Sequence, residues 1–262
     1  MIDLKPLLAE YIPPKVPFRE SQLNMLVNFL DNNTGIIVVR GSSGLGKTLL
    51  FKKAMAASEK AASLFSYISV HRFSSYKQML REICYRFSSF DFTSHLSIKN
   101  ALYNIKKRMD YSNVDKLVLF LDDCLSMSDL NKTVNLIQYL TRNNIDTVFF
   151  ISTRIKSIKL IEIIRNIRNI NEKHIMDLPR YTSKELKIIF EYRFRLTNCP
   201  AEYVESQVFN YLADIVYRYF YSNVTIGLAL IYRAVQEVLY KNISKISSQV
   251  VENLLRHHFN PM

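Results

Sequence analysis

Apolar runs and helical periodicity alternate along residues 20–180 of the chain. After Glu20, leucines and a valine recur three and four positions apart, which predicts an amphipathic helix that begins there. Continuous apolar runs rich in β-branched and aromatic residues predict five buried strands, at 35–41, 64–70, 116–124, 147–153 and 174–179. Helical stretches separate these strands, for example at 74–87. Alternation of this kind predicts an α/β domain with a five-stranded parallel sheet flanked by helices.

The pattern changes after Pro179, where the chain continues as helix after helix. The predicted helices lie at 182–197, 203–221, 224–240 and 244–258 and indicate a small all-helical domain. At the other end, residues 1–19 hold four of the seven prolines and predict an extended lead-in. The expected division is therefore 1–19, 20–180 and 181–262, in a chain of 262 residues with room for a substantial core.

The composition is that of an ordinary globular protein, with 48% hydrophobic and 22% charged residues. No apolar run approaches the roughly 18–20 residues of a membrane span, and the first residues do not resemble a signal peptide, so we expect no membrane contact. Cys84, Cys124 and Cys199 lie far apart, which predicts reduced thiols in the cytosol or nucleus rather than a zinc site. The pair His257–His258 predicts a solvated helix end.

The net charge of +12 changes this picture. It favours a polyanion or an acidic partner, because long-range attraction steers opposite charges together. Lysine enrichment with solvated helix faces explains the excess equally well. Arg72 and Lys77, beside the second predicted strand, motivate a weaker hypothesis of direct DNA binding. No set of residues resembles a base-reading module such as a zinc finger.

The loop after the first predicted strand carries the clearest chemical signal. "GSSGLGKT", Gly41 to Thr48, fits GxxxxGK[ST] between a buried strand and a helix. Its glycines let backbone N–H groups wrap around phosphates, while Lys47 is expected to reach the β- and γ-phosphates and Thr48 to bind Mg²⁺. Three of the five glycines of the protein lie in this loop, which makes a chance match improbable. The expected nucleotide contacts are Gly41, Ser42, Ser43, Gly44, Leu45, Gly46, Lys47, Thr48 and Leu49.

Two carboxylates end the third predicted strand, where a P-loop site needs a second metal ligand. Asp122 is expected to fix Mg²⁺ together with Thr48, directly or through water. In P-loop enzymes of the additional-strand class, a Glu usually follows this Asp directly and activates the attacking water. Asp123 is one methylene shorter and is only a weak candidate base. The fourth strand ends in Ser152 and Thr153, polar residues able to sense the γ-phosphate, with Thr153 as the sensor-like candidate.

Several motifs taken together resemble the AAA+ initiator clade, the family of origin recognition complex subunits and their archaeal relatives. "VPFRESQLNML" resembles the lead-in of the clade, which lies over the adenine and here contains Arg19. "IMDLPRYTSKELKIIF" resembles its fifth strand and the following helix start. Within the clade, "PFRESQ", a Walker B stretch without Glu and "PRYTSKEL" are most similar to subunit 5 of the eukaryotic complex. The resemblance covers residues 12–240.

The resemblance implies an AAA+ nucleotide-binding domain over 20–180 and a helical lid with the start of a shortened C-terminal region over 181–262. It implies ATP and Mg²⁺ as cofactors, with ATP stabilising subunit contacts rather than being efficiently hydrolysed. Thr225 stands where the lid often carries an arginine that reaches the phosphates. Arg165 or Arg168 is the candidate arginine offered to a neighbour's nucleotide, and a solvated cation on a helix surface is the alternative for each.

The same resemblance implies partners and a location. The partners are other AAA+ origin recognition complex subunits in a hetero-oligomeric ring, with double-stranded DNA bound through the assembly to mark origins and load the helicase. The implied location is the nucleus. The alternative is an active AAA+ ATPase of the clamp-loader or DNA-repair type, which needs Asp123 or a partner to complete the site. A scaffold without nucleotide is a third possibility, opposed by the intact Lys47 and Thr48.

Overall fold

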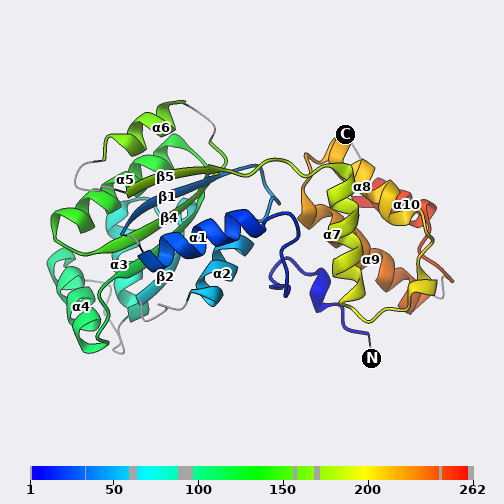
Figure 1. The fold of residues 1–262 in the computed structure, drawn as a ribbon, viewed down its shortest axis with the longest axis horizontal. Helices are drawn as coiled ribbons and strands as arrows, with labels where there is room; N and C mark the ends of the chain where they lie inside the picture. Colours follow the sequence, from blue (N-terminus) through cyan, green and yellow to red (C-terminus); the bar gives the residue numbers. More distant parts are fainter. Residues whose placement is uncertain are drawn as a thin grey trace. The chain divides into compact units, whose positions relative to one another are not determined.

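The structure is a computed structural model that describes residues 2–32, 34–58, 64–87, 97–155, 158–167, 172–241 and 244–258. The chain divides into two compact units (Figure 1). The sheet unit comprises Ser21–Gly41 and Lys47–Leu178. The helical unit comprises Met1–Glu20, Ser42–Gly46 and Pro179–Met262.

The sheet unit is built on five parallel strands in the order β2-β3-β4-β1-β5. Their bounds are β1 Gly35–Arg40, β2 Leu64–Ser69, β3 Leu117–Cys124, β4 Thr147–Thr153 and β5 Glu172–Asp177. All of β4 and nearly all of β1 are buried, because both faces of the sheet are covered, and this is why they read as continuous apolar runs. The predicted five-stranded parallel sheet is confirmed. Its last strand ends at Asp177, two residues earlier than predicted, since Pro179 has no N–H to extend the ladder.

Helices cover both faces of this sheet (Figure 1). The helices of the unit are α1 Glu20–Asn32, α2 Lys47–Ala57, α3 Tyr76–Phe87, α4 Ile98–Tyr111, α5 Met127–Arg142 and α6 Ile158–Arg165. On one face, Phe29 of α1 and Phe51 of α2 both contact the ring of Phe150 in β4. On the other face, α3, α4, α5 and α6 share one apolar core with β1, β3 and β4. Polar residues lie at the carboxyl ends of β3 and β4, where the two strands end in Asp122–Cys124 and Ser152–Thr153.

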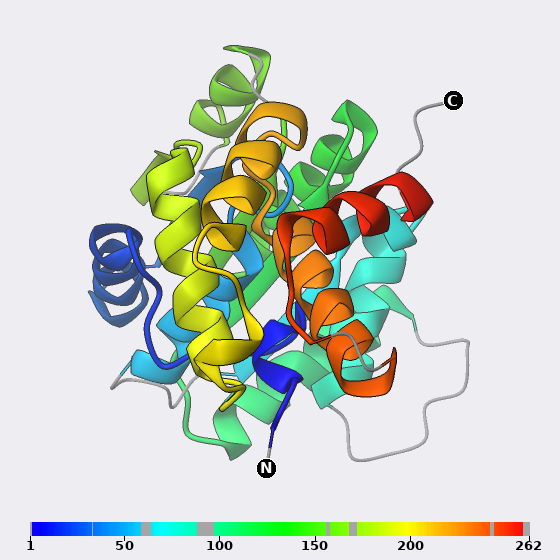
Figure 2. The same cartoon turned by 90° about the vertical axis from the view of Figure 1, so that its right-hand side faces the viewer.

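The helical unit contains α7 Ser183–Arg195, α8 Val208–Tyr219, α9 Val224–Lys241 and α10 Ser248–His258 (Figure 2). α7 begins at a capping box. Thr182 Oγ1 accepts from the N–H of Glu185 at 3.2 Å, and the Glu185 carboxylate accepts from the N–H of Thr182 at 2.7 Å. The helix predicted from residue 203 begins only at Val208, because Ala201–Tyr203 form a 3-10 turn. None of the described helices is long and apolar enough to cross a membrane.

The N-terminal segment packs on α7 inside the helical unit. The guanidinium of Arg193, only 5% exposed, donates to the carbonyl oxygens of Pro6 and Leu8 and lies 5.2 Å from the ring centre of Tyr11. Burial lowers the pKa of Arg193 to about 10. The segment interpreted as an extended lead-in therefore includes a 3-10 turn at Lys5–Leu7, and a buried cation fixes its carbonyl groups.

Candidate functional site

The loop Gly41–Thr48 joins the carboxyl end of β1 to the first turn of α2. The N–H of Gly41 donates to the carbonyl of Thr153 in the neighbouring strand β4 at 3.1 Å, which fixes the start of the loop on the sheet. Gly44 and Gly46 have φ angles of 74° and 87°, a left-handed backbone that favours glycine. The loop thus needs glycine for its shape and delivers the chain to a helix N-terminus, where unpaired N–H groups attract anions.

Lys47 is the cation of this loop. Its Nζ donates to the carbonyl of Gly41 at 2.8 Å. Burial, and next the nearby charge of Arg154, lower the pKa of Lys47 to about 8, although Asp122 and Asp123 act in the opposite direction. A negatively charged group beside Nζ would raise the pKa of Lys47 again, because it favours the charged ammonium group. The surroundings of Lys47 therefore suit an anion such as a phosphate.

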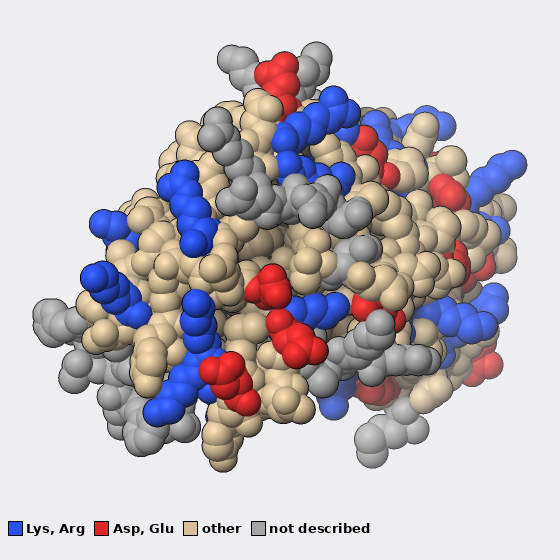
Figure 3. All heavy atoms as spheres, turned by 60° about the vertical axis from the view of Figure 1, so that its left-hand side comes forward, with Lys and Arg blue, Asp and Glu red and all other residues tan. Residues whose placement is uncertain are grey.

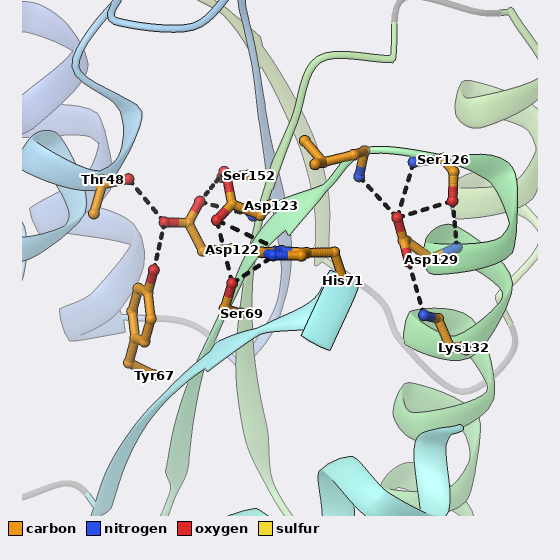
Figure 4. Close-up of polar contacts among 11 residues, drawn as sticks. Thr48, Tyr67, Ser69, His71, Asp122, Asp123, Ser126, Asp129, Lys132 and Ser152 are labelled. Carbon is orange, nitrogen blue, oxygen red and sulfur yellow. Dashed lines mark hydrogen bonds and ion pairs between the residues drawn. The ribbon is translucent and has the colours of Figure 1, made fainter. Parts of the chain in front are cut away.

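The carboxylate of Asp122 lies at the centre of a hydrogen-bonded group at the carboxyl end of β3 (Figure 4). It is only 3% exposed. Its Oδ2 accepts from Thr48 Oγ1 at 2.8 Å and from the Tyr67 hydroxyl at 3.0 Å. Its Oδ1 accepts from Ser152 Oγ and from the N–H of Asp123, the latter at 2.9 Å. We call Thr48, Tyr67, Asp122 and Ser152 the Asp122 cluster.

The donor chemistry of the Asp122 cluster fits Mg²⁺. Thr48 contributes a hydroxyl and Asp122 a carboxylate, both hard oxygen ligands of the kind that magnesium prefers. No group of three or more His, Cys, Asp and Glu gathers to hold a metal within the described ranges. A magnesium ion at Thr48 therefore depends on phosphate and water oxygens for the rest of its shell, as is usual for this ion.

Tyr67 acts in the Asp122 cluster as a hydrogen-bond donor. Burial, and next the charge of Asp122, raise the pKa of Tyr67 well above its usual value. The hydroxyl accordingly keeps its proton, and the hydrogen bond to Asp122 Oδ2 keeps its direction.

Asp123 has a different setting from its neighbour. Its φ is 55°, in the left-handed region, and the pairing of β3 with β4 shifts register between Leu121 and Cys124. The side chain is 38% exposed. Its Oδ2 accepts from Ser69 Oγ at 3.2 Å and lies 3.8 Å from His71 Nδ1, which is itself 3.1 Å from Ser69 Oγ. We call Ser69, His71 and Asp123 the Asp123 rim (Figure 4).

The two polar residues at the end of β4 point to opposite faces of the sheet. Ser152 donates to Asp122, as described above. Thr153 Oγ1 donates to the carbonyl of Cys124 at 2.7 Å and accepts from the N–H of Ile155 at 3.0 Å. Ser152 is therefore the residue of the pair that joins the carboxylate, while the sensor role chosen for Thr153 stays a prediction.

Arg19, expected near the adenine, lies in the helical unit. It is 4% exposed, and its guanidinium lies 3.9 Å from the ring centre of Tyr181. It donates to the carbonyl of Pro179 at 2.6 Å. Its adenine contact stays a prediction, and its observed partners include the ring of Tyr181 and the carbonyl oxygens of Phe18 and Pro179.

The middle of the loop contacts the start of α9 within the helical unit. The N–H of Val224 donates to the carbonyl of Gly44 at 3.3 Å, and a Cβ added to Gly44 would lie 1.8 Å from Asn223 Oδ1. Glycine is thus required at position 44 by close approach as well as by φ. Thr225 is exposed in the first turn of α9, and its N–H donates to Asn223 Oδ1 at 3.1 Å.

The remaining predicted residues lie as follows. Leu45 is buried, whereas Ser42, Ser43 and Leu49 are half-buried. Arg165 is exposed in the last turn of α6, and Arg168 lies outside the described residues. Arg72 and Lys77 are exposed. On the face shown in Figure 3, Lys and Arg side chains are spread widely, with a short run of Asp and Glu near the centre of the view.

Sequence reasoning missed Tyr67, Ser69, His71 and Asn223. A signal for the first two was present, because Tyr67 and Ser69 stand two positions apart near the end of the strand predicted at 64–70. Strand alternation places both on one face, and parallel strands end at the same edge of a sheet. No comparable pattern marked His71, which lies in the 3-10 turn Val70–Arg72 after β2, or Asn223, which directly precedes α9.

Comparisons with known proteins agree on the fold. The NB-ARC domain profile matches residues 19–166. No curated protein sequence matches the chain. The Aeropyrum pernix ORC2 protein, solved as ADPNP and ADP complexes, is similar with 16% identity and a TM-score of 0.79, covering 99% of this chain and 72% of that one.

Two structures solved with DNA are also similar. The Aeropyrum pernix ORC1 protein in complex with DNA has 18% identity and a TM-score of 0.77, covering 97% of this chain and 69% of that one. A chain of Drosophila ORC bound to DNA has 17% identity and a TM-score of 0.71, covering 98% of this chain and 65% of that one. At these identities the likeness concerns the fold, and the predicted AAA+ P-loop NTPase fold is confirmed.

Proposed function

Since the chain belongs to the NB-ARC domain family, we propose that it binds ATP with Mg²⁺ at the loop Gly41–Thr48. The observation that carries this proposal is the 2.8 Å hydrogen bond from Thr48 Oγ1 to Asp122 Oδ2. It joins the last residue of the loop motif to the buried carboxylate of β3, which is the pair of oxygens that a P-loop site uses for its metal.

Each residue of the site has a role in the proposed complex. Lys47 neutralises phosphate oxygens beside the loop, at a position where burial makes a counter-charge favourable. Thr48 offers its hydroxyl oxygen to Mg²⁺ while its proton is held by Asp122. The ion supplies neutralisation of the charge on the phosphates. The loop backbone and the N-terminus of α2 supply N–H groups.

We further propose that ATP is held and hydrolysed slowly. Asp123 is one methylene shorter than Glu, its backbone is left-handed, and its carboxylate accepts from Ser69 at 3.2 Å. A general base has to reach the attacking water within hydrogen-bond distance. Thr225, in the lid, has no positive charge to offer to the phosphates. These features support binding over turnover.

The larger role that we propose is that of an ATP-binding subunit of an origin recognition complex, with subunit 5 as the specific candidate. The motifs "FRESQ" and "PRYTSKEL" support it, as do similar folds among ORC proteins solved with DNA. The proposed division is a lead-in at 1–19, an AAA+ domain at 20–180 and a lid with the start of a shortened C-terminal region at 181–262. ATP would stabilise contacts in a ring of unlike AAA+ subunits in the nucleus, and double-stranded DNA would bind through the assembly.

Arg165 or Arg168 is proposed to reach a neighbour's nucleotide. The exposure of Arg165 at the end of α6 supports availability to a partner. Arg72 and Lys77, both exposed, are the proposed contribution of this chain to DNA affinity. Binding through such cations should weaken steeply as salt increases, because phosphate contacts release counterions.

Two experiments test the proposal. Equilibrium binding of a fluorescent ATP analogue should be strong for the wild type and lost in Lys47→Ala, with Lys52→Ala as a matched control on the same helix. Mass spectrometry of proteins that co-purify with the tagged chain in ATP buffer should recover several other AAA+ chains in near-equal amounts. Recovery of the chain alone would contradict the subunit role and leave nucleotide binding standing.

The second candidate is an active AAA+ ATPase of the clamp-loader or DNA-repair type. It is favoured by the retained carboxylate at Asp123, 38% exposed and so accessible to water. Turnover by the isolated chain that Asp123→Ala abolishes would favour this candidate over the first.

A further inference from the structure

The edge strand β2 brings a group to the Asp122 cluster that the loop motif does not require. The Tyr67 hydroxyl donates to Asp122 Oδ2 at 3.0 Å, and the same oxygen accepts from Thr48 at 2.8 Å (Figure 4). In the register of β2 with β3, Tyr67 is paired with Phe120 and Ser69 with Asp122. Tyr67 therefore reaches Asp122 along the diagonal, a distance that long aromatic side chains span.

The ring of Tyr67 is held by aromatic packing. Its centre lies 5.3 Å from that of Phe120, which is stacked at 3.9 Å on Phe51 of α2. Phe51 also contacts Phe150 of β4 at 4.9 Å. Phe51 and Thr48 both belong to α2. The helix that supplies the expected metal ligand therefore also packs against Phe120, the ring that contacts Tyr67. The position of the hydroxyl is thus set by the core of the unit.

The hydrogen bonds on Asp122 occupy both of its oxygens. Oδ2 accepts from Thr48 and Tyr67, while Oδ1 accepts from Ser152 and the N–H of Asp123. An ionised carboxylate offers about four lone-pair sites. The terminal torsion of an aspartate is broad, so these donors decide its orientation. Tyr67 and Thr48 come from different elements, β2 and α2, and donate to the same oxygen, Oδ2.

We propose that Tyr67 is a positioning residue of the magnesium site. It holds Asp122 Oδ2 in place to accept the hydrogen bond from the Thr48 hydroxyl. The lone pairs of Thr48 Oγ1 are then free to face the ion. The inference rests on the proposed function, because it requires a magnesium nucleotide at the loop. Removal of such an outer partner commonly weakens metal affinity about 10- to 100-fold.

The test compares Tyr67→Phe with the wild type in the full chain. Binding of a fluorescent ATP analogue is measured in EDTA and then across a Mg²⁺ titration. The variant should need at least about tenfold more Mg²⁺ to reach half of the metal-dependent gain in affinity, while its affinity in EDTA stays that of the wild type. Tyr139→Phe, which removes a hydroxyl from the half-buried ring on α5, is the matched control and should behave as the wild type.

The outcomes separate the inference from the proposed function. An unchanged Mg²⁺ midpoint in Tyr67→Phe overturns the positioning role, and so does an equal loss of affinity in EDTA, which indicates general damage. A wild type that binds the nucleotide without any response to Mg²⁺ also overturns it, yet nucleotide binding stands. A wild type that binds no nucleotide overturns both proposals.

Discussion

Asp122 and Asp123 are neighbours in the chain whose surroundings differ in almost every respect. Asp122 is 3% exposed and accepts four hydrogen bonds, from residues of α2, β2, β3 and β4. The side chain of Asp123 is 38% exposed and accepts from Ser69 of the edge strand, with His71 nearby. The Asp122 cluster thus combines residues of α2, β2, β3 and β4, whereas the neighbours of Asp123 in the Asp123 rim come from the end of β2 and the 3-10 turn that follows it.

The difference originates in the backbone of β3. After Leu121 the pairing with β4 shifts register, and Asp123 takes a left-handed φ of 55°. A bulge of this kind re-aims the side chains that follow it. Two identical residue types therefore receive unlike tasks, one as a buried anchor of Thr48 and the other as an accessible carboxylate. Sequence adjacency alone says little about shared function.

The largest effect should separate the two carboxylates by their isosteric amides. Asp122→Asn is expected to reduce Mg²⁺-dependent ATP affinity on the order of 100-fold, because it removes a negative charge and an acceptor from the metal site. Asp123→Asn should change it by no more than about twofold, since an exposed charge is well screened. Fluorescent nucleotide titration in Mg²⁺ measures both. Equal losses in the two variants would contradict the comparison.

A longer side chain at the rim should recover turnover. Asp123→Glu places the carboxylate one methylene closer to an attacking water, so ATP hydrolysis is expected to rise at least about tenfold, within the range of a positioned general base. Phosphate release under multiple turnover measures it, with Asp123→Ala as the control. A rate no higher than that of Asp123→Ala would show that the rim cannot host a base.

Serine-to-alanine changes on the two sides should differ in stability. Ser152→Ala removes a donor from a buried carboxylate and should lower the free energy of unfolding by about 1–3 kcal/mol. Ser69 is 7% exposed, but the Asp123 carboxylate that it serves is accessible to water, so Ser69→Ala should cost only about 0.5–1 kcal/mol. Urea denaturation gives both values. A larger loss for Ser69→Ala would reverse the ranking of the two regions.

The smallest effect concerns His71. On the Asp123→Glu background, His71→Ala should change ATP hydrolysis by no more than about threefold, because the ring lies 3.8 Å from the carboxylate at the exposed rim. The same phosphate assay measures it. A loss of all the turnover gained by Asp123→Glu would make His71 part of the catalytic machinery instead.

Much of the sheet unit could be predicted from sequence, because its signals are local and strong. Buried parallel strands read as apolar runs, and the loop Gly41–Thr48 combines a fixed spacing with scarce glycines. Asp122 could be identified because parallel strands deliver their carboxyl ends to one edge. Its hydrogen-bond partner Thr48 could be identified as the last residue of the loop motif Gly41–Thr48. The roles of both residues toward Mg²⁺ remain predictions.

What sequence reasoning missed depends on register and irregular backbone. Tyr67 meets Asp122 only through the diagonal of the β2–β3 pairing, and strand periodicity does not determine which residues of two strands face each other. The left-handed φ of Asp123 has no sequence marker, since glycine, the usual marker, is absent there. Nor does periodicity reveal that the carbonyl groups of Pro6 and Leu8 accept from Arg193.

The hydrogen bond between Pro6 and Arg193 has a consequence for the order of events during synthesis. The two residues are 187 positions apart. At ribosomal speeds of about 5–20 residues per second, roughly 10–40 s pass between the synthesis of Pro6 and that of Arg193. The sheet unit is complete at Leu178 and can form during that interval. The segment around Pro6 is therefore synthesised well before its partner Arg193, and until Arg193 is in place this segment is open to proteases and chaperones.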